Sequence, residues 1–126
     1  FPIENLYLLA SERSAGTRLQ FGGKSVMVTD VSTFDFSQVQ IALFSAGGSV
    51  SAVYAPVAAA AGCIVIDNTS EFRRDPEIPL IVPEVNLHRL EDYKKSNIAN
   101  IDLKVRLIHP GEANFLGNNQ LLKSIH

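Results

Sequence analysis

One stretch of the sequence, residues 39–68, most narrowly limits the folds open to this chain. It begins with VQIALFSAGG, whose apolar run over 41–44 is typical of a strand buried on both faces. A helical pattern follows, with apolar residues at the spacing of one face: Val50, Val53, Tyr54, Val57, Ala58 and Ala61. Gly62 predicts the end of this helix, and CIVIDN, residues 63–68, predicts a second buried strand. Strand, helix and strand in this order form the crossover unit of a parallel sheet, so the sequence predicts an α/β fold.

Shorter elements surround this unit. Residues 6–10, LYLLA, predict another fully buried strand, and residues 18–29 alternate around a pair of glycines and predict a β-hairpin. Residues 79–85, PLIVPEV, predict a short strand between two prolines, and 86–96 predict an amphipathic helix capped by its first residue, an asparagine. Residues 101–109, IDLKVRLIH, are compatible with one more strand, and the remainder has the composition of a loop.

Composition and charge exclude several classes of function. The 126 residues carry a formal net charge of −2 with the basic residues scattered, whereas nucleic-acid and membrane-surface binders need a concentrated basic face. No apolar stretch reaches the roughly 20 residues that span a bilayer, and no signal segment opens the chain. The single cysteine, Cys63, allows no internal disulfide and gives no metal-ligand spacing. We therefore expect a cytosolic domain without metal, nucleic-acid partner or membrane contact.

The first candidate site follows the first predicted strand, because ligands of doubly wound sheets bind past the carboxyl ends of strands. Ser11, Arg13 and Ser14 offer two hydroxyls and a guanidinium beside the backbone amides of Ala15 and Gly16. Such donors could hold a phosphate, at the place where the adenosine ribose of a dinucleotide lies. An acidic residue there favours NAD, whereas an arginine can meet the 2′-phosphate of NADP. Taken alone, these residues more often form only a solvated loop.

Two further candidates follow later strands. The small residues of 45–48 let a ligand approach the backbone closely, and the helix that follows can present its N-terminal amides to an anion. A tight turn between strand and helix explains these residues equally well. The pair Arg73-Arg74 suits a carboxylate or phosphate, but such pairs are more often solvated.

Candidates for a nucleophile and a base are weaker. Cys63 begins a predicted buried strand with no basic partner nearby, so we expect an inert core position. His88, His109 and His126 have no serine or cysteine partner at a recognisable spacing. The residues by themselves therefore predict no catalytic group.

Three stretches, in the same order, resemble the bacterial aspartate-semialdehyde dehydrogenases: LLASERSAGTRLQFGGKSVMV, IALFSAGGSVSAVYAPVAAAAGCIVIDNTSEFRRDPEIPLIVPEVN and NIAN. The similarity is continuous over about residues 1–100. It implies a Rossmann-like fold, with a mostly parallel sheet and helices on both faces. It also implies the reaction of that family, in which NADPH reduces aspartyl phosphate to aspartate semialdehyde and phosphate on the route to lysine, methionine and threonine. The intact enzymes are cytoplasmic homo-oligomers that act on small molecules.

The resemblance also implies roles for single residues. Three match the loop that grips the 2′-phosphate of NADP: Ser11, Arg13 and Ser14. Three match the turn that runs along the cofactor towards the nicotinamide: Ser45, Ala46 and Gly47. Arg73 matches the arginine that receives the substrate phosphate.

The departures from the family set further expectations. The family begins with a strand and a glycine-rich turn of the form GATGAVG, which this chain does not show. The catalytic cysteine of the family lies in a Pro-Asn-Cys-Ser-Thr segment after NIAN, whereas here Asn100 runs into IDLKVRL and no cysteine follows Cys63. The acid–base histidine and the dimerisation domain have no counterpart. We therefore expect a partial NADP-binding domain over 1–100, incomplete at the N-terminus, and an unrelated tail over 101–126.

Two consequences follow from this expectation. The chain alone should be catalytically inactive, because the nucleophile and the base are absent. The absent first strand would lie between the strands at 6–10 and 41–44, so these strands should expose apolar edges and lower stability unless they pair or the tail fills the gap. Two other functions stay open, a nucleotide-binding module without catalysis and a related acyl-phosphate reductase.

Overall fold

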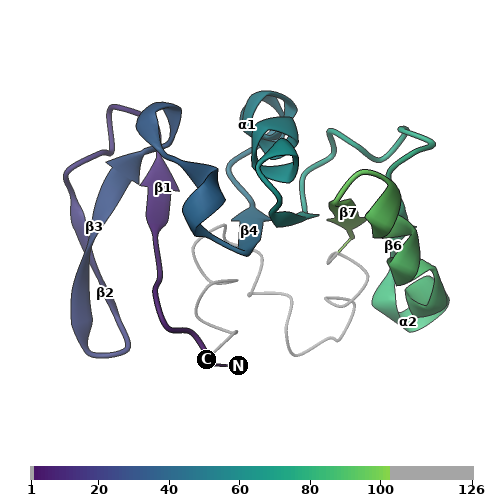
Figure 1. Cartoon of the computed structure of the whole chain (residues 1–126), viewed down its shortest axis with the longest axis horizontal. Helices are drawn as coiled ribbons and strands as arrows, with labels where there is room; N and C mark the ends of the chain where they lie inside the picture. The colour runs from purple at the N-terminus through teal and green to yellow at the C-terminus, as the bar shows by residue number, and fades with distance from the viewer. Residues whose placement is uncertain (1, 103–126) are drawn as a thin grey trace, which may run out of the picture. The chain divides into compact units, whose positions relative to one another are not determined.

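The computed structural model describes residues 2–102, and these fall into two compact units that meet in the sequence between Phe36 and Ser37. The thin grey trace in Figure 1 marks the remaining residues. Each unit is described by itself. Among the residues described, no helix is long and apolar enough to cross a membrane.

The first unit is a three-stranded sheet in the order β1-β3-β2 (Figure 1). Strand β1 (Leu8–Ala10) runs parallel to β3 (Lys24–Asp30), and β2 (Arg18–Phe21) runs antiparallel to β3. The predicted hairpin is confirmed. Gly22 and Gly23 have φ values of 54° and 77°, the left-handed conformation that a tight two-residue hairpin turn requires at both positions.

The prediction of a fully buried strand over 6–10 is wrong in one respect. Strand β1 begins at Leu8 and is half-buried, and the Tyr7 side chain before it is exposed. The Tyr7 ring packs instead on Phe34 with centroids 5.3 Å apart, and Phe34 packs edge-on against the buried Phe36 at 5.2 Å. The core of this unit is therefore small and aromatic, with Val28 and Val31 as its buried aliphatic residues.

The second unit is a four-stranded parallel sheet in the order β4-β5-β7-β6 (Figure 1). Its strands are β4 (Ile41–Phe44), β5 (Ile64–Asp67), β6 (Leu80–Ile81) and β7 (Ile98–Ile101). Helix α1 (Gly48–Ala60) connects β4 to β5 and packs against β5, β4 and β7. The predicted strand–helix–strand unit is confirmed, and Gly62, at φ 96°, follows the helix end as expected.

The buried face of helix α1 agrees with the predicted one only in part, because Ala58 is buried and Val50 and Tyr54 are half-buried. Ser51, Ala55 and Ala58 face the sheet, whereas Val53 and Val57 are 57% and 51% exposed. Because α1 is apolar on nearly all sides, periodicity alone does not select its inner face. The small side chains at the inner positions let the helix backbone approach the strands closely, and the helix continues through Pro56.

The predicted amphipathic helix over 86–96 is also wrong. A short helix α2 (Pro83–Asn86) leads into a 3₁₀ segment η3 (Leu87–Lys95), and neither has a buried residue. The Asn86 side chain does not cap a helix. It accepts a hydrogen bond from the Val82 amide at 2.7 Å and donates one to the Leu80 carbonyl at 2.9 Å, so it ties α2 to β6.

Strand β7 lies inside the sheet, between β5 and β6, although the sequence pattern did not reveal it. Ile98, Ala99 and Asn100 are all buried there. Four residues, one of them an asparagine, are too short a run to predict a strand. Of the extra strand considered over 101–109, residues 103–109 lie outside the described part of the chain.

Strands β1 and β4 are each at the edge of their own sheet. The expectation that each of these strands lacks a neighbour on one side therefore agrees with the two sheets of residues 2–102. Exposed apolar side chains accompany this edge in the second unit, where Ile41 and Leu43 on β4 are 41% and 57% exposed.

Candidate functional site

The loop after β1 carries Ser11, Arg13 and Ser14, and all three side chains are exposed. The loop is held by its own backbone, because the Ser11 carbonyl accepts from the amides of Ser14 at 2.9 Å and Ala15 at 3.1 Å. The Gly16 amide donates to the Val28 carbonyl on β3 at 2.9 Å. The expectation that the amides of Ala15 and Gly16 are available to a phosphate is therefore wrong. An anion at this loop would therefore not be held by these two amides, whereas the side chains of Ser11, Arg13 and Ser14 are exposed to it.

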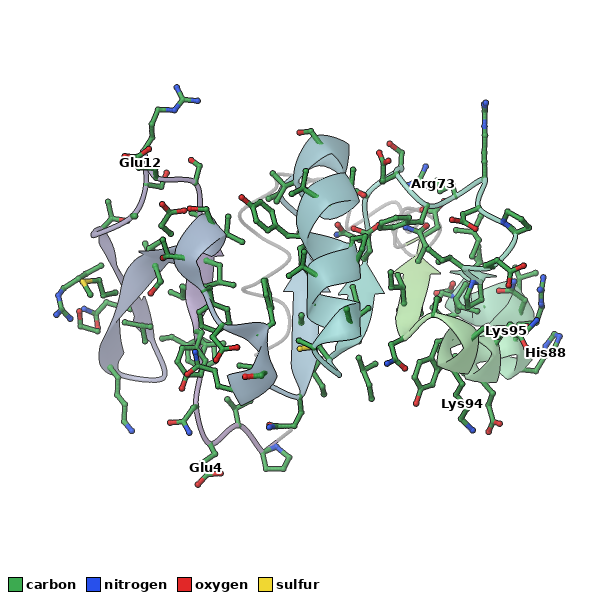
Figure 2. All side chains as sticks on the ribbon, turned by 45° about the horizontal axis from the view of Figure 1, so that its top comes forward. Glu4, Glu12, Arg73, His88, Lys94 and Lys95 are labelled. Carbon is green, nitrogen blue, oxygen red and sulfur yellow. The ribbon has the colours of Figure 1, made fainter. Side chains whose placement is uncertain are left out.

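Those side chains are suited to such a task. Within residues 2–102, no hydrogen bond or ion pair to the Arg13 guanidinium is found. The loop beneath it is fixed by the Thr17 hydroxyl, which donates to the Ser14 carbonyl at 2.8 Å, and by the Val28 amide, which donates to the Thr17 carbonyl at 2.8 Å. Glu12 on the same loop is exposed as well (Figure 2). The loop thus presents a guanidinium and two hydroxyls to solvent, next to one carboxylate.

The second candidate, the turn of Ser45, Ala46 and Gly47, joins β4 to α1 and is exposed. Gly47 is the N-cap of α1 with φ 110°, and no side chain caps the helix there. A Cβ added at Gly47 would find no atom within 4 Å, so the space over this turn is open. The turn can therefore accept a flat group close to its backbone, and its conformation requires glycine.

A carboxylate lies beside the same turn. A Cβ added at Gly48 would lie 3.2 Å from Oε2 of Glu71, which places that carboxylate at the first residue of α1. The positive end of the helix dipole stabilises a negative charge at this position. A second anion would be repelled by Glu71, so the local charge favours an uncharged or cationic group over a phosphate.

Arg73 lies on the segment between β5 and β6 (Figure 2). Phe72 beside it is buried, whereas the Arg73 side chain is 26% exposed and its Nη2 lies 4.0 Å from Oδ1 of Asp102. Its Nε is buried and has no hydrogen-bond partner within residues 2–102. An unpaired buried donor costs about 1–3 kcal/mol, so this guanidinium is suited to bind a further acceptor. Its neighbour Arg74 is exposed.

A buried polar cluster at the carboxyl end of β5 was not predicted. Asp67 is fully buried and its carboxylate accepts from the Ser51 hydroxyl at 2.6 Å, the Thr69 hydroxyl at 2.9 Å and the Asn100 amide at 2.7 Å. Asn100 Nδ2 also lies within hydrogen-bond distance of the carbonyls of Asp67, at 3.2 Å, and Thr69, at 2.8 Å. The one signal in the sequence is an acidic residue at the end of an otherwise apolar strand.

Cys63 is fully buried, with Sγ 3.3 Å from the Val39 carbonyl oxygen. Burial raises the pKa of the Cys63 thiol, which disfavours the nucleophilic thiolate. Its position agrees with the inert core residue that the sequence predicts. His88 is exposed on η3, and His109 and His126 lie outside the described residues.

The predicted site residues thus fall into two groups. Ser11, Arg13 and Ser14 share one loop of the first unit, and the 45–47 turn and Arg73 belong to the second. Within the second unit, Asp67 connects the segments that carry both of its candidates, since it binds Ser51 of α1 and Thr69.

Comparison with known proteins gives consistent matches. The family described as "Semialdehyde dehydrogenase, NAD binding domain" matches residues 1–93. Aspartate-semialdehyde dehydrogenase 2 of Vibrio cholerae is 58% identical over 98 residues, which are 78% of this chain and 29% of that protein. The crystal structure of aspartate semialdehyde dehydrogenase II from V. cholerae complexed with ASA matches with a TM-score of 0.77 and 56% identity, over 80% of this chain and 33% of that chain.

A more distant structure shares the fold. Aspartate semialdehyde dehydrogenase with NADP from Candida albicans is 21% identical and matches with a TM-score of 0.63, over 89% of this chain and 39% of that chain. The predicted Rossmann-like architecture is confirmed by these matches. The chain spans about a third of the length of the proteins that it matches.

Proposed function

The chain belongs to the semialdehyde dehydrogenase family, through its NAD-binding domain, and from this premise we propose that it is the NADP-binding domain of an aspartate-semialdehyde dehydrogenase. The parent reaction is the reduction of aspartyl phosphate by NADPH to aspartate semialdehyde and phosphate. The observation that carries the choice of NADP over NAD is the exposed guanidinium of Arg13, which has no partner within residues 2–102, at the end of β1.

Arg13 would hold the 2′-phosphate of NADP together with the hydroxyls of Ser11 and Ser14. Guanidinium–phosphate hydrogen bonds are charge-assisted and stronger than neutral ones. The amides of Ala15 and Gly16 are bonded to carbonyls of the chain itself, so these three side chains, and not those two amides, would contact the phosphate. NADH has no 2′-phosphate, so Arg13 would discriminate between the two cofactors.

The turn of Ser45, Ala46 and Gly47 would lie along the nicotinamide part of the cofactor, which supplies the hydride when bound. Gly47 leaves open space over its backbone. The carboxylate of Glu71 at the start of α1 is compatible with a nicotinamide, which is neutral or cationic, and repels phosphate from this turn. The residues of the turn therefore fit the end of the cofactor that carries no negative charge.

Arg73 would bind the phosphate of the substrate. Its partly exposed guanidinium carries a buried Nε without a partner among residues 2–102, and its contact with Asp102 is long, at 4.0 Å. A phosphate oxygen can satisfy such a donor and form two parallel hydrogen bonds with an arginine.

Thioester formation and hydride transfer would belong to the whole enzyme. We propose that the 126-residue polypeptide alone does not catalyse the reaction, because no cysteine follows Cys63 in its sequence and Cys63 is buried. The proposal retains a domain over 1–100, an unrelated tail over 101–126, a cytosolic location and homo-oligomeric parent enzymes acting on small molecules.

The test is titration of the 126-residue chain with NADPH and NADH, followed by cofactor fluorescence. Arg13→Ala should weaken NADPH binding by about tenfold or more and leave NADH binding nearly unchanged, since it removes charge-assisted hydrogen bonds to one phosphate. Arg18→Ala is the matched control, because Arg18 is an exposed arginine of the same unit. Equal losses for both cofactors would remove the 2′-phosphate role from Arg13.

A further inference from the structure

We propose that Asp67 is a positioning residue that holds two ligand-binding segments of the second unit in place, the turn at 45–48 and the segment 68–73 that carries Arg73. This inference rests on the proposed function, because the two segments are those assigned to the nicotinamide and to the substrate phosphate. Asp67 itself is fully buried and touches neither ligand.

One branch of the cluster leads from Asp67 to the start of α1. The Ser51 hydroxyl donates to Oδ1 of Asp67 at 2.6 Å, and Ser51 is fully buried in the first turn of the helix. The Ser51 amide donates to the Gly47 carbonyl at 3.1 Å. No side chain caps α1, so the bond from Ser51 to Asp67 directly anchors the start of the helix to β5. The start of α1 is also the end of the ligand-binding loop at 45–48.

The other branch leads to the segment after β5. The Thr69 hydroxyl donates to Oδ2 of Asp67 at 2.9 Å and accepts from the Glu71 amide at 3.3 Å. The Asn100 amide on β7 donates to the same Oδ2 at 2.7 Å and to the Thr69 carbonyl at 2.8 Å. These bonds fix the backbone up to Glu71, two residues before Arg73.

The chemistry of Asp67 suits this task. A carboxylate accepts hydrogen bonds at both oxygens, so the Asp67 side chain can receive three donors: one from α1, one from the segment after β5, and one from β7. A buried carboxylate without these donors would be strongly unfavourable, so each donor is held firmly. An asparagine has one accepting oxygen and would turn an NH₂ group towards a donor. Asp67 therefore fixes the two segments relative to each other within one unit.

The test uses the full 126-residue chain and variants that cut one branch each. Ser51→Ala cuts the branch to α1, and Thr69→Val cuts the branch to the segment after β5, while Thr69→Ser keeps the hydroxyl. Val65→Ala is the matched control, because Val65 is fully buried on β5 and its loss destabilises the unit without removing a polar contact.

The first readout is amide hydrogen exchange by NMR, which needs no ligand. The amide of residue 51 bonds to the Gly47 carbonyl, and the Asp75 amide bonds to the Phe72 carbonyl at 3.1 Å, so they report on the two segments without being cut by the substitutions. Relative to Val65→Ala, the Ser51→Ala variant should accelerate exchange about three- to tenfold at residue 51 only. Thr69→Val should do so at Asp75 only, and Thr69→Ser should resemble the unsubstituted chain.

The second readout is binding of NADPH and of inorganic phosphate. Ser51→Ala should weaken NADPH and spare phosphate, and Thr69→Val should weaken phosphate and spare NADPH. Equal acceleration of both amides in every variant, or losses of both ligands in proportion to stability, would overturn the positioning role. A chain that binds neither ligand would instead refute the proposed function, and the exchange pattern would still decide whether Asp67 positions the two segments.

Discussion

The Asn100 side-chain amide donates to the Asp67 carboxylate over 2.7 Å, and both residues are fully buried in the parallel sheet of the second unit. This bond joins adjacent strands β5 and β7 through their side chains, in addition to their backbone pairing at Asp67 and Asn100. The same amide also contacts the carbonyls of Asp67 and Thr69, so Asn100 holds the backbone at the carboxyl end of β5 against β7.

The first prediction concerns this bond. Asn100→Ala should lower the free energy of unfolding by about 2–4 kcal/mol, since it leaves a cavity and removes a donor from a buried carboxylate. Urea denaturation followed by circular dichroism measures the change. Ile98→Val on the same strand is the control and should lose only about 1 kcal/mol. A similar loss for both variants would show that packing, not the hydrogen bond, gives Asn100 its importance.

The second prediction concerns Asp102 and Arg73, whose charged groups lie 4.0 Å apart. A carboxylate beside the guanidinium competes with a phosphate for the same positive charge. Asp102→Asn should therefore tighten the binding of inorganic phosphate by about two- to fivefold, in keeping with a partly exposed ion pair. Isothermal titration calorimetry measures the affinity, and Arg73→Ala should abolish it.

The control for this experiment is Asp92→Asn, which removes a carboxylate that pairs with Arg89 at 3.3 Å, on η3. It should leave phosphate affinity unchanged. Unchanged or weaker phosphate binding in Asp102→Asn would contradict competition at Arg73.

The third prediction concerns Cys63. Burial raises its pKa in the folded chain, so the native thiol should react with a disulfide reagent far more slowly than the same thiol in urea. The unfolded chain releases this proton at the ordinary pKa of a thiol, while the folded chain retains it to higher pH. The contribution of Cys63 to stability is therefore fully present below the ordinary pKa of a thiol and is lost as the pH rises through the pKa of the folded chain.

Unfolding experiments at neutral and alkaline pH measure this dependence, with Cys63→Ala as the control that should lack it. Rapid modification of the native chain at neutral pH would contradict the buried position.

The sequence predicts those parts of the structure that depend on interactions between residues close together in the chain. The unit of β4, α1 and β5 follows from apolar runs and glycines that lie next to one another in the sequence, and the hairpin follows from Gly22-Gly23. The inner face of α1 does not, because it depends on Ser51 meeting Asp67, 16 residues further along the chain. Strand β7 was missed because its four residues form a strand only between β5 and β6.

The candidate site shows the same division. The rule that ligands bind after strands locates Ser11, Arg13 and the 45–47 turn, since it needs only the strand ends. It could not show that the Gly16 amide is bonded to Val28 on another strand. It also could not bring Glu71 to the start of α1, because that contact depends on how the segment after β5 folds back.

The last prediction concerns the free edge of the parallel sheet. Strand β4 is an edge strand within residues 2–102, and Ile41 and Leu43 on it are 41% and 57% exposed. An unpaired apolar edge is a template for association, so the chain should self-associate as its concentration rises. Its thermal unfolding should have a low midpoint temperature and poor cooperativity. Leu43→Lys should shift the chain towards a monomer in sedimentation equilibrium, because edge lysines oppose strand pairing. Val85→Lys, at a side chain 73% exposed and away from this edge, should leave association unchanged. A monomer with one cooperative thermal transition would mean that the β4 edge is protected in solution.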